Sequence, residues 1–541
     1  MKRISGNIVD VVHAQIYPGT LLISEGRIVD IIQEETGDDT YIMPGFVDAH
    51  IHIESSMLTP AEFSRIATLH GTVAVISDPH EIANVLGVDG ITYMIDDAET
   101  TPLKFCFGAP SCVPATPFET AGAVVGVKEV EELLERDEIG YLAEVMNFPG
   151  VLNGDTDTMA KLHAAASCAK PVDGHAPGLR GSDLKRYIDT GISTNHECLS
   201  CDEARENIEK GVKVLIRKGS AADIFEECLP ILGKHYGSCM FCSDDKHPDD
   251  LLKGHINDMV REAVNYGVDV MKVLKIASIN PVSHYRLNVG LLRRGDPADF
   301  IRVDNLTDFN ILETHIEGKI VASRGASLIT RRNPRIINNF HATPKDPSSF
   351  EIPYSEGKIH IITAADDTLF TDTFTDIPKV EKGCAVSDTE RDIIKLAVVN
   401  RYRGAKPAVG FINGFGIQTG AIASSVAHDS HNIVAVGVSD EDICRAVNLI
   451  IDNRGGIVAV SKHGESVLPL PIAGIMSDKD YAIVAEQYIQ LNEMAKDMGS
   501  RLRTPFMTLS FMALLVIPKI KMSDEGLFDA EKFSLIDLLC R

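Results

Sequence analysis

Basic residues are scarce in this chain. Its 541 residues include 52 Lys and Arg against 77 Asp and Glu, so the formal net charge is −25. A protein that binds the phosphate backbone of a nucleic acid needs a basic face. The charge balance therefore argues against a nucleic-acid partner, although it carries no information about the fold.

Long apolar runs are absent as well. No uninterrupted apolar stretch reaches the ~18 residues that a membrane-spanning helix needs, so we expect no membrane partner. The first residues, MKRISGNIVDVVH, include basic side chains but lack the apolar segment of a signal peptide. Eleven cysteines, an odd number, fit free thiols in a reducing compartment better than disulfides. These features predict a cytoplasmic protein.

Between residues 46 and 284, short β-rich runs alternate with helical segments. The first run begins with Phe46 and Val47. Seven more follow it: VAVISD (73–78), LKFCFGAP (103–110), YLAEVM (141–146), PVDGH (171–175), ISTNHE (192–197), KVLIRKGS (213–220) and CMFCSDD (239–245). Eight alternating β/α units predict an α/β protein built on a parallel (β/α)8 barrel, a fold of about 250 residues.

Strand-like segments flank the predicted barrel on both sides. Residues 1–45 include GNIVDVV and GTLLISEGRIVDIIQ, and residues 285–340 include GDPADFIRVDNLTDFNILETHIEGKIVASRG. The first and last elements of a closed barrel are neighbours, so the two flanks are expected to pair. After a Pro- and Ser-rich stretch near residue 340, residues 341–541 mix strands and helices. They are expected to form a separate C-terminal α+β domain.

The ends of the predicted strands carry side chains that bind metals. In a (β/α)8 barrel, functional groups lie at the C-terminal ends of the strands. Six imidazole or carboxylate groups occupy such positions: His50, His52, Glu144, His175, His196 and Asp244. Two histidines at spacing two on a strand point to the same side. Six ligands exceed the needs of one catalytic metal, so we predict two divalent ions of the Zn, Mn or Fe type.

Other readings of these residues are weaker. Each histidine alone is more often a hydrogen-bonded side chain than a ligand, but separate strand ends supply the donors in barrel order. A competing metal motif consists of Cys198-x-x-Cys201 and Cys239-x-x-Cys242. Cys239 and Cys242 lie in one predicted strand, where a spacing of three directs side chains to opposite faces. The cysteine motif is therefore disfavoured.

Longer motifs carry a family resemblance. PGFVDAHIH, followed by the later Glu, His and Asp ligands, resembles the metal-dependent amidohydrolase superfamily. More narrowly, the chain resembles the bacterial and archaeal adenine deaminases. The motifs that carry this resemblance are HIHIESSM, SDPHEIANVLG, EVMNFPGVLNGD, DGHAPGL, NHECLS, SDDKHPDDLLKGHIND, SSVAHDSHNIVAVG, LPLPIAGIMSD and PFMTLSFMALLVIP. They run from near the start of the chain to near its end and cover every proposed domain.

The resemblance implies an activity and its cofactors. The implied reaction is hydrolysis of adenine to hypoxanthine and ammonia, in purine salvage, by a hydroxide that bridges two divalent ions. Mn or Fe is favoured, with Zn as the alternative. The resemblance also implies the barrel, a small β-sandwich built from both flanks, a family-type C-terminal domain and a homo-oligomer. Two alternatives stay open: an amidohydrolase of another purine or a cyclic amide, and a non-catalytic scaffold, which usually loses its metal ligands.

Individual roles follow from this resemblance. Asp244 is expected to take the proton of the hydroxide and deliver it to the leaving amine. Glu144 takes the place of the carbamylated lysine of many superfamily relatives as the bridging ligand, and it is also a candidate to protonate adenine N1. Asp78 and His80 are expected to orient the purine or to relay protons. The alternative is that SDPHE forms only a turn and a helix cap.

A polar loop in the C-terminal part is the last candidate. Residues 424–437, SSVAHDSHNIVAVG, gather hydroxyl, imidazole and carboxylate groups before an apolar strand. We predict that this loop reaches the barrel mouth and that His428 contributes to substrate binding by closing the adenine pocket. The alternative is a surface turn in which Asp429 and Asn432 cap their own backbone.

Overall fold

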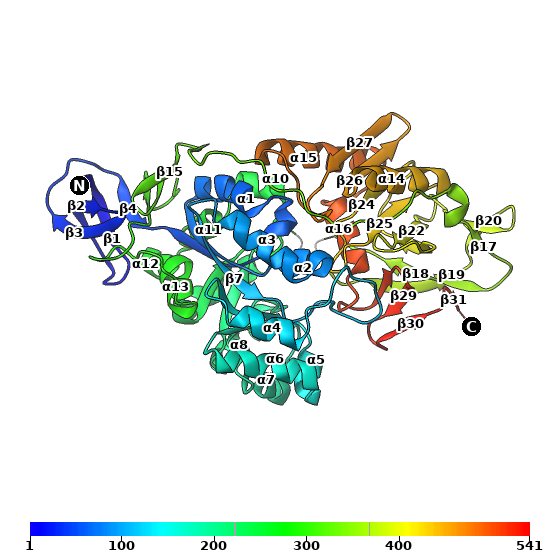
Figure 1. Ribbon diagram of the computed structural model, residues 1–541, viewed down its shortest axis with the longest axis horizontal. Coiled ribbons are helices and arrows are strands. Elements are labelled where there is room, and N and C mark those ends of the chain that lie inside the picture. Colours follow the sequence, from blue (N-terminus) through cyan, green and yellow to red (C-terminus); the bar gives the residue numbers. More distant parts are fainter. Residues whose placement is uncertain (221–222, 367, 541) are drawn as a thin grey trace.

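The computed structural model describes residues 1–220, 223–366 and 368–540. Eight short parallel strands form two sheets, one of five strands and one of three, in the part of the molecule that contains β7 in Figure 1. They are β5 (Phe46–Ile51), β6 (Thr72–Ser77), β7 (Lys104–Ala109), β8 (Ile139–Val145), β9 (Val172–Gly174), β10 (Thr194–Asn195), β11 (Lys213–Arg217) and β12 (Cys239–Cys242). A parallel bridge from Ile51 to Asp244 joins the first of these strands to the end of the last. The predicted (β/α)8 barrel is confirmed.

Burial explains why these segments are strands. All residues of β5, β6 and β12 are buried, as expected for parallel strands that are covered on both faces. Helices lie on the outside of the barrel. They include α1 (Pro60–Ala67), α2 (His80–Leu86), α3 (Val88–Ala98), α4 (Val127–Leu134), α6 (Thr156–Ser167), α7 (Gly181–Ile188), α8 (Cys201–Glu209), α9 (Phe225–His235) and α11 (Ile256–Tyr266).

The two flanks of the barrel form one eight-stranded sheet, at the left of Figure 1. Its strands, in spatial order, are β16 (Ala326–Ser327), β15 (Lys319–Ser323), β14 (Ile311–Ile316), β13 (Phe300–Val303), β4 (Tyr41–Pro44), β1 (Lys2–Asp10), β2 (Gln15–Ser24) and β3 (Arg27–Gln33). The flanks meet where β4 runs antiparallel to β13, with Ile42 opposite Arg302. The expected pairing of the flanks is therefore observed.

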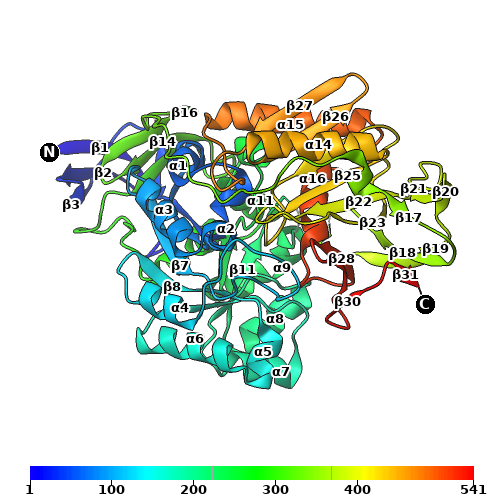
Figure 2. The ribbon, with the colours of Figure 1, turned by 45° about the vertical axis from the view of Figure 1, so that its right-hand side comes forward.

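The C-terminal part contains a second large sheet (Figure 2). Its strands are β18 (Lys358–Thr363), β19 (Asp372–Asp376), β22 (Ile394–Val399), β23 (Ala408–Asn413), β24 (Ala421–Ser424), β25 (Ile433–Gly437), β26 (Gly456–Ser461), β27 (Gly464–Pro469) and β31 (Leu539–Cys540). Helix α14 (Asp440–Asn453) packs on this sheet, and its N-cap Ser439 accepts a hydrogen bond from the backbone N–H of Asp442. This mixture of helices and strands confirms the α+β class of the C-terminal part.

Helix α15 (Tyr481–Asp497) connects the C-terminal part to the barrel. Arg65 of α1 forms an ion pair of 2.7 Å with Asp480, directly before α15. Further along the helix, the hydroxyl of Tyr488 lies 2.5 Å from Nδ1 of His247, which follows β12. These contacts place the C-terminal domain over the C-terminal ends of the barrel strands.

Two further expectations concern cysteines and membranes. All eleven cysteines are free thiols, and Cys239 and Cys242 are the two ends of β12. Among the helices in the described ranges, none has the length and apolarity that crossing a membrane requires.

Candidate metal centre and active site

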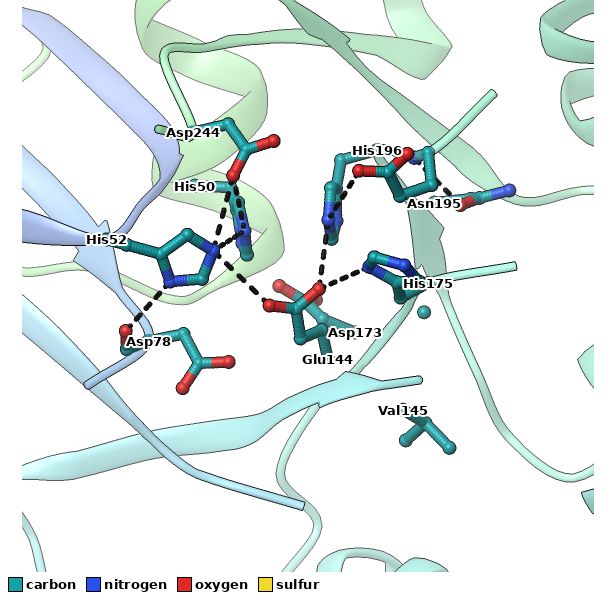
Figure 3. Close-up of polar contacts among 12 residues, drawn as sticks. His50, His52, Asp78, Glu144, Val145, Asp173, His175, Asn195, His196 and Asp244 are labelled. Atoms are coloured by element: carbon teal, nitrogen blue, oxygen red, sulfur yellow. Dashed lines mark hydrogen bonds and ion pairs between the residues drawn. The ribbon is translucent and has the colours of Figure 1, made fainter. Parts of the chain in front are cut away.

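The barrel brings all six predicted metal ligands together at its C-terminal end (Figure 3). His50 lies in β5 and Glu144 in β8, whereas the other four follow the ends of strands. These four are His52 after β5, His175 after β9, His196 after β10 and Asp244 after β12. His175 is partly exposed and the other five are buried.

Glu144 is at the centre of this cluster. Its Oε2 lies 2.6 Å from Nδ1 of His175 and 3.0 Å from Nε2 of His196. Its Oε1 lies 3.3 Å from Nε2 of His52, and Oδ1 of Asp244 is 3.2 Å from the same nitrogen. A carboxylate whose two oxygens face different histidines suits a bridge between two ions.

The hydrogen bond of His52 leaves one ring nitrogen for a cation. Its Nδ1 lies 3.1 Å from the backbone carbonyl of Asp78, which can only accept, so this nitrogen donates and the neutral ring has a lone pair at Nε2. That lone pair faces oxygens of Glu144 and Asp244 and, at 3.2 Å, Nε2 of His50. Converging lone pairs repel one another unless a cation lies among them. Imidazole and carboxylate ligands together suit divalent transition metals.

Neighbouring side chains keep the two carboxylates ionised. Burial alone would raise the pKa of Glu144, but His175 and His196 hold this pKa well below its usual range. Burial would also raise the pKa of Asp244, and there the guanidinium of Arg217 holds the pKa well below its usual range. The ionised form is the one that binds a metal.

Arg217, the last residue of β11, is absent from the predicted set. Its guanidinium forms an ion pair of 2.5 Å with Oδ2 of Asp244 and contacts both carboxylate oxygens of Glu197. Asp244 therefore directs one oxygen to the histidines while the guanidinium holds the other. The signal in the sequence was a basic residue at the C-terminal end of a barrel strand that offered no other candidate.

Asp78 and His80 lie beside the metal-ligand cluster. Nδ1 of His80 is 3.3 Å from Oδ2 of Asp78 and 3.4 Å from Oε1 of Glu144. Within the described residues, neither carboxylate oxygen of Asp78 has a hydrogen-bond partner. Pro79, rather than Asp78, is the N-cap of α2, and no side chain caps that helix. The alternative of a helix cap is therefore wrong, and a role in binding the purine stays a prediction.

The loop between β24 and β25 reaches the barrel mouth of its own chain. His428 is only 2% exposed, and its Nδ1 lies 2.5 Å from Oε1 of Glu81, in the first turn of α2. His431 contacts the other oxygen of the same carboxylate. The side chain of Asn432 donates to the carbonyl of Thr120 rather than capping its own backbone. The alternative of a surface turn is therefore wrong.

A cavity of about 40 Å³ connects the metal-ligand cluster with this loop. The barrel contributes Glu144 and Asp244 to its walls, and the C-terminal domain contributes His428, Asp429 and Ile517. Pockets that hold small molecules typically measure about 300–1,000 Å³. The two domains therefore enclose the site in a closed arrangement.

This fold and this site define a class, the barrel hydrolases that use divalent metal. The amidohydrolase family matches residues 41–321, and the adenine deaminase C-terminal domain matches residues 368–534.

Relatives match along the whole chain. An adenine deaminase of Salinibacter ruber is 51% identical, and the match covers 99% of this chain and 98% of that one. Adenine deaminases of a Sulfurovum species and of Methanosarcina mazei are 53% and 48% identical, each over 99% of both chains. The chain therefore belongs to the amidohydrolase family and, within it, to the adenine deaminases.

Proposed function

We propose that this protein hydrolyses adenine to hypoxanthine and ammonia at the cluster around Glu144. One observation carries the proposal: in a chain that belongs to the adenine deaminases, the metal-ligand cluster and a buried loop of the C-terminal domain line the same cavity. The barrel then supplies the chemistry and the C-terminal domain encloses the substrate.

The proposed cofactors are two divalent transition metal ions, Mn or Fe in preference to Zn. His50, His52, His175, His196 and Asp244 would hold them, with Glu144 as the shared ligand. Ligand atoms of His50, His196 and Asp244 lie within 4.8 Å of one another, as do those of Glu144, His175 and His196. When bound, such ions supply Lewis acidity that lowers the pKa of water enough to create a nucleophile at neutral pH.

Two carboxylates move the protons in this proposal. Asp244 takes a proton from the attacking water and delivers it to the amine that leaves C6. Arg217 fixes the orientation of Asp244 by holding its second oxygen. Glu144, which is ionised, first takes the other proton of this water and passes it to N1 as C6 becomes tetrahedral, so that the two protons of the water end on N1 and on the released ammonia. Asp78 and His80 orient the purine beside these groups.

His428 belongs to the part that closes the site. Its loop packs over the barrel mouth and excludes water from the purine. Exclusion of water strengthens each polar contact to the charge that develops at C6. We also assign the protein to purine salvage in the cytoplasm, as a homo-oligomer, with domain boundaries near residues 45, 284 and 340.

A product assay on purified, metal-replete protein tests this function. Adenine should yield equal amounts of hypoxanthine and ammonia, and metal analysis of the same sample should find about two equivalents of divalent metal. Other purines and cyclic amides serve as competing substrates in the same assay. Faster turnover of one of these, with adenine left intact, would replace the proposal with the alternative amidohydrolase activity.

A further inference from the structure

A carboxylate of the barrel holds two histidines of the C-terminal domain. Glu81 is 2% exposed, and its oxygens contact His428 and His431, which lie 347 and 350 residues later in the chain. Burial alone would raise the pKa of Glu81, but His428, His80 and His431 hold it well below its usual range. We call the group of Glu81, His428 and His431 the clamp.

Both ring nitrogens of His431 have hydrogen-bond partners, one of them in the clamp. Its Nδ1 accepts a hydrogen bond from the backbone N–H of Ala427 at 3.2 Å, so the proton of the neutral ring is on Nε2, which donates to Glu81. Of the residues that line the cavity in the described part of the chain, His428 and Asp429 come from this loop and His431 does not. His431 therefore only fastens the loop.

His428 has one nitrogen that the clamp does not use. Nδ1 contacts Glu81, and the ring stacks on Phe511 with centroids 4.6 Å apart and planes 11° apart. The backbone N–H of His428 donates to the carbonyl of Ser510 at 3.1 Å, which fixes the residue further. Nε2 is buried and has no hydrogen-bond partner among the described residues, although the residue lines the cavity. A structural clamp needs only Nδ1.

The charge of His428 determines what Nε2 can recognise. Burial alone would lower the pKa of His428, but Glu81 outweighs burial and the pKa is raised to about 9. Near neutral pH both ring nitrogens then carry hydrogen, so Nε2 is a donor. The ring nitrogens N1, N3 and N7 of adenine are acceptors, and a buried donor that faces a C–H group instead loses its hydrogen bond.

We propose that Nε2 of His428 donates a hydrogen bond to a ring nitrogen of adenine and thereby selects the substrate. Glu81 is the positioning residue, because it fixes the rotation of the imidazole from the other side. This inference rests on the proposed function and adds a specific donor to it. It makes the C-terminal loop part of substrate recognition as well as a cover for the site.

Matched variants separate recognition from fastening. His428→Asn keeps an amide near the position of Nδ1, which contacts Glu81, but removes the donor at Nε2. His428→Gln places an amide near the position of Nε2. His431→Asn weakens only the fastening. Metal content and melting temperature are measured for each variant, so that loss of the fold is recognised.

Inhibition constants of 1-deaza-, 3-deaza- and 7-deazaadenine, together with the KM and kcat for adenine, provide the readout. His428→Asn should weaken binding of adenine ten-fold or more. For one analogue, the one that lacks the accepting nitrogen, wild type and His428→Asn should bind equally. His428→Gln should recover part of the lost affinity, and His431→Asn should change adenine and all three analogues by the same small factor.

Three results would overturn the inference: no weakening of adenine binding in His428→Asn, the same weakening for adenine and every analogue, or an equal effect of His431→Asn. Should His428→Asn fail to fold, His428→Ala, which also removes the donor at Nε2, is compared with wild type on the same analogues, and the same criteria apply. Failure of the proposed function looks different, because the metal-replete wild type would then leave adenine unchanged.

Discussion

The metal-ligand cluster and the clamp are both buried groups of histidine and carboxylate beside one cavity, but they are built in opposite ways. In the metal-ligand cluster, lone pairs of His52, Glu144 and Asp244 face one another. In the clamp, two N–H groups face the two oxygens of Glu81. The first arrangement suits a bound metal ion, and the second is complete by itself.

This difference indicates how the two domains divide the work. The barrel gathers imidazole and carboxylate groups that suit divalent metal ions, as a reaction with water requires. The C-terminal domain is attached by contacts that are satisfied without metal. Loss of the metals should therefore abolish the chemistry while leaving the domains docked, and the following predictions test this division in order of decreasing effect.

Removal of the metals should have the largest effect. A chelator should abolish adenine turnover, and Mn, Fe or Zn should restore it, because the cluster then lacks the Lewis acid that activates water. Turnover and metal content are measured on the same samples, with protease resistance of the full chain as the readout of docking. Full activity in metal-free protein would contradict the assignment of the cluster.

Asp244→Asn should come next. The amide keeps an oxygen but cannot accept the proton, and general acid–base groups contribute about 10²–10⁴-fold, so kcat should fall by at least ~10³ when the ligand is weakened too. Steady-state kinetics with restored metal measure this loss. If the variant kept more than a tenth of its activity, another residue would be the base.

Arg217→Ala should reduce stability. Glu197 and Asp244 would lose their shared guanidinium, and removal of one partner from a buried ion pair costs about 3–5 kcal/mol. Arg205→Ala is the matched control, since its pair with Asp202 is exposed and contributes about 0–1 kcal/mol. Urea unfolding of the metal-loaded proteins compares the two variants, and similar losses would remove the special role of Arg217.

The pH profile should show the smallest effect. His428 has a pKa raised to about 9, so its cation persists at neutral pH and is lost as pH rises through 9. Only the cation donates from Nε2. Loss of this cation should therefore halve kcat/KM for adenine near pH 9. The His428→Asn variant retains every other titratable group of the protein but lacks this imidazole. An identical alkaline limb in the variant would show that His428 is not its origin.

The sequence predicts the metal-ligand cluster because the C-terminal ends of all strands of a barrel lie close together. Eight β-rich runs therefore imply that His175 and Asp244 are near one another, whatever their separation in the chain. Nothing comparable constrains the clamp. The contact between Glu81 and His428 depends on how two domains dock, which hydrophobic periodicity does not encode. The polar loop around His428 was visible in the sequence, but its partner was not.

Arg217 shows a different limit of prediction from the sequence. It lies in a segment that the sequence predicts to be a strand, but a basic residue is not a metal ligand, so a search for ligands does not predict its role. Its function is to hold a ligand, a role that appears only when Asp244 is found beside it. The domain boundaries at residues 45, 284 and 340 and the roles of the site residues stay predictions.

The sheet shared by the two flanks has a consequence for how the chain is made. Strand β4 contains Ile42, and its partner in β13 is Arg302. At about 5–20 residues per second, a ribosome needs on the order of tens of seconds to synthesise the segment between them. During that time the edge of β4 that faces β13 has no partner, and exposed strand edges invite pairing with other chains. The first strands to be synthesised thus complete their sheet only after all eight barrel strands have been made, so protection of the nascent chain matters while the barrel is being synthesised.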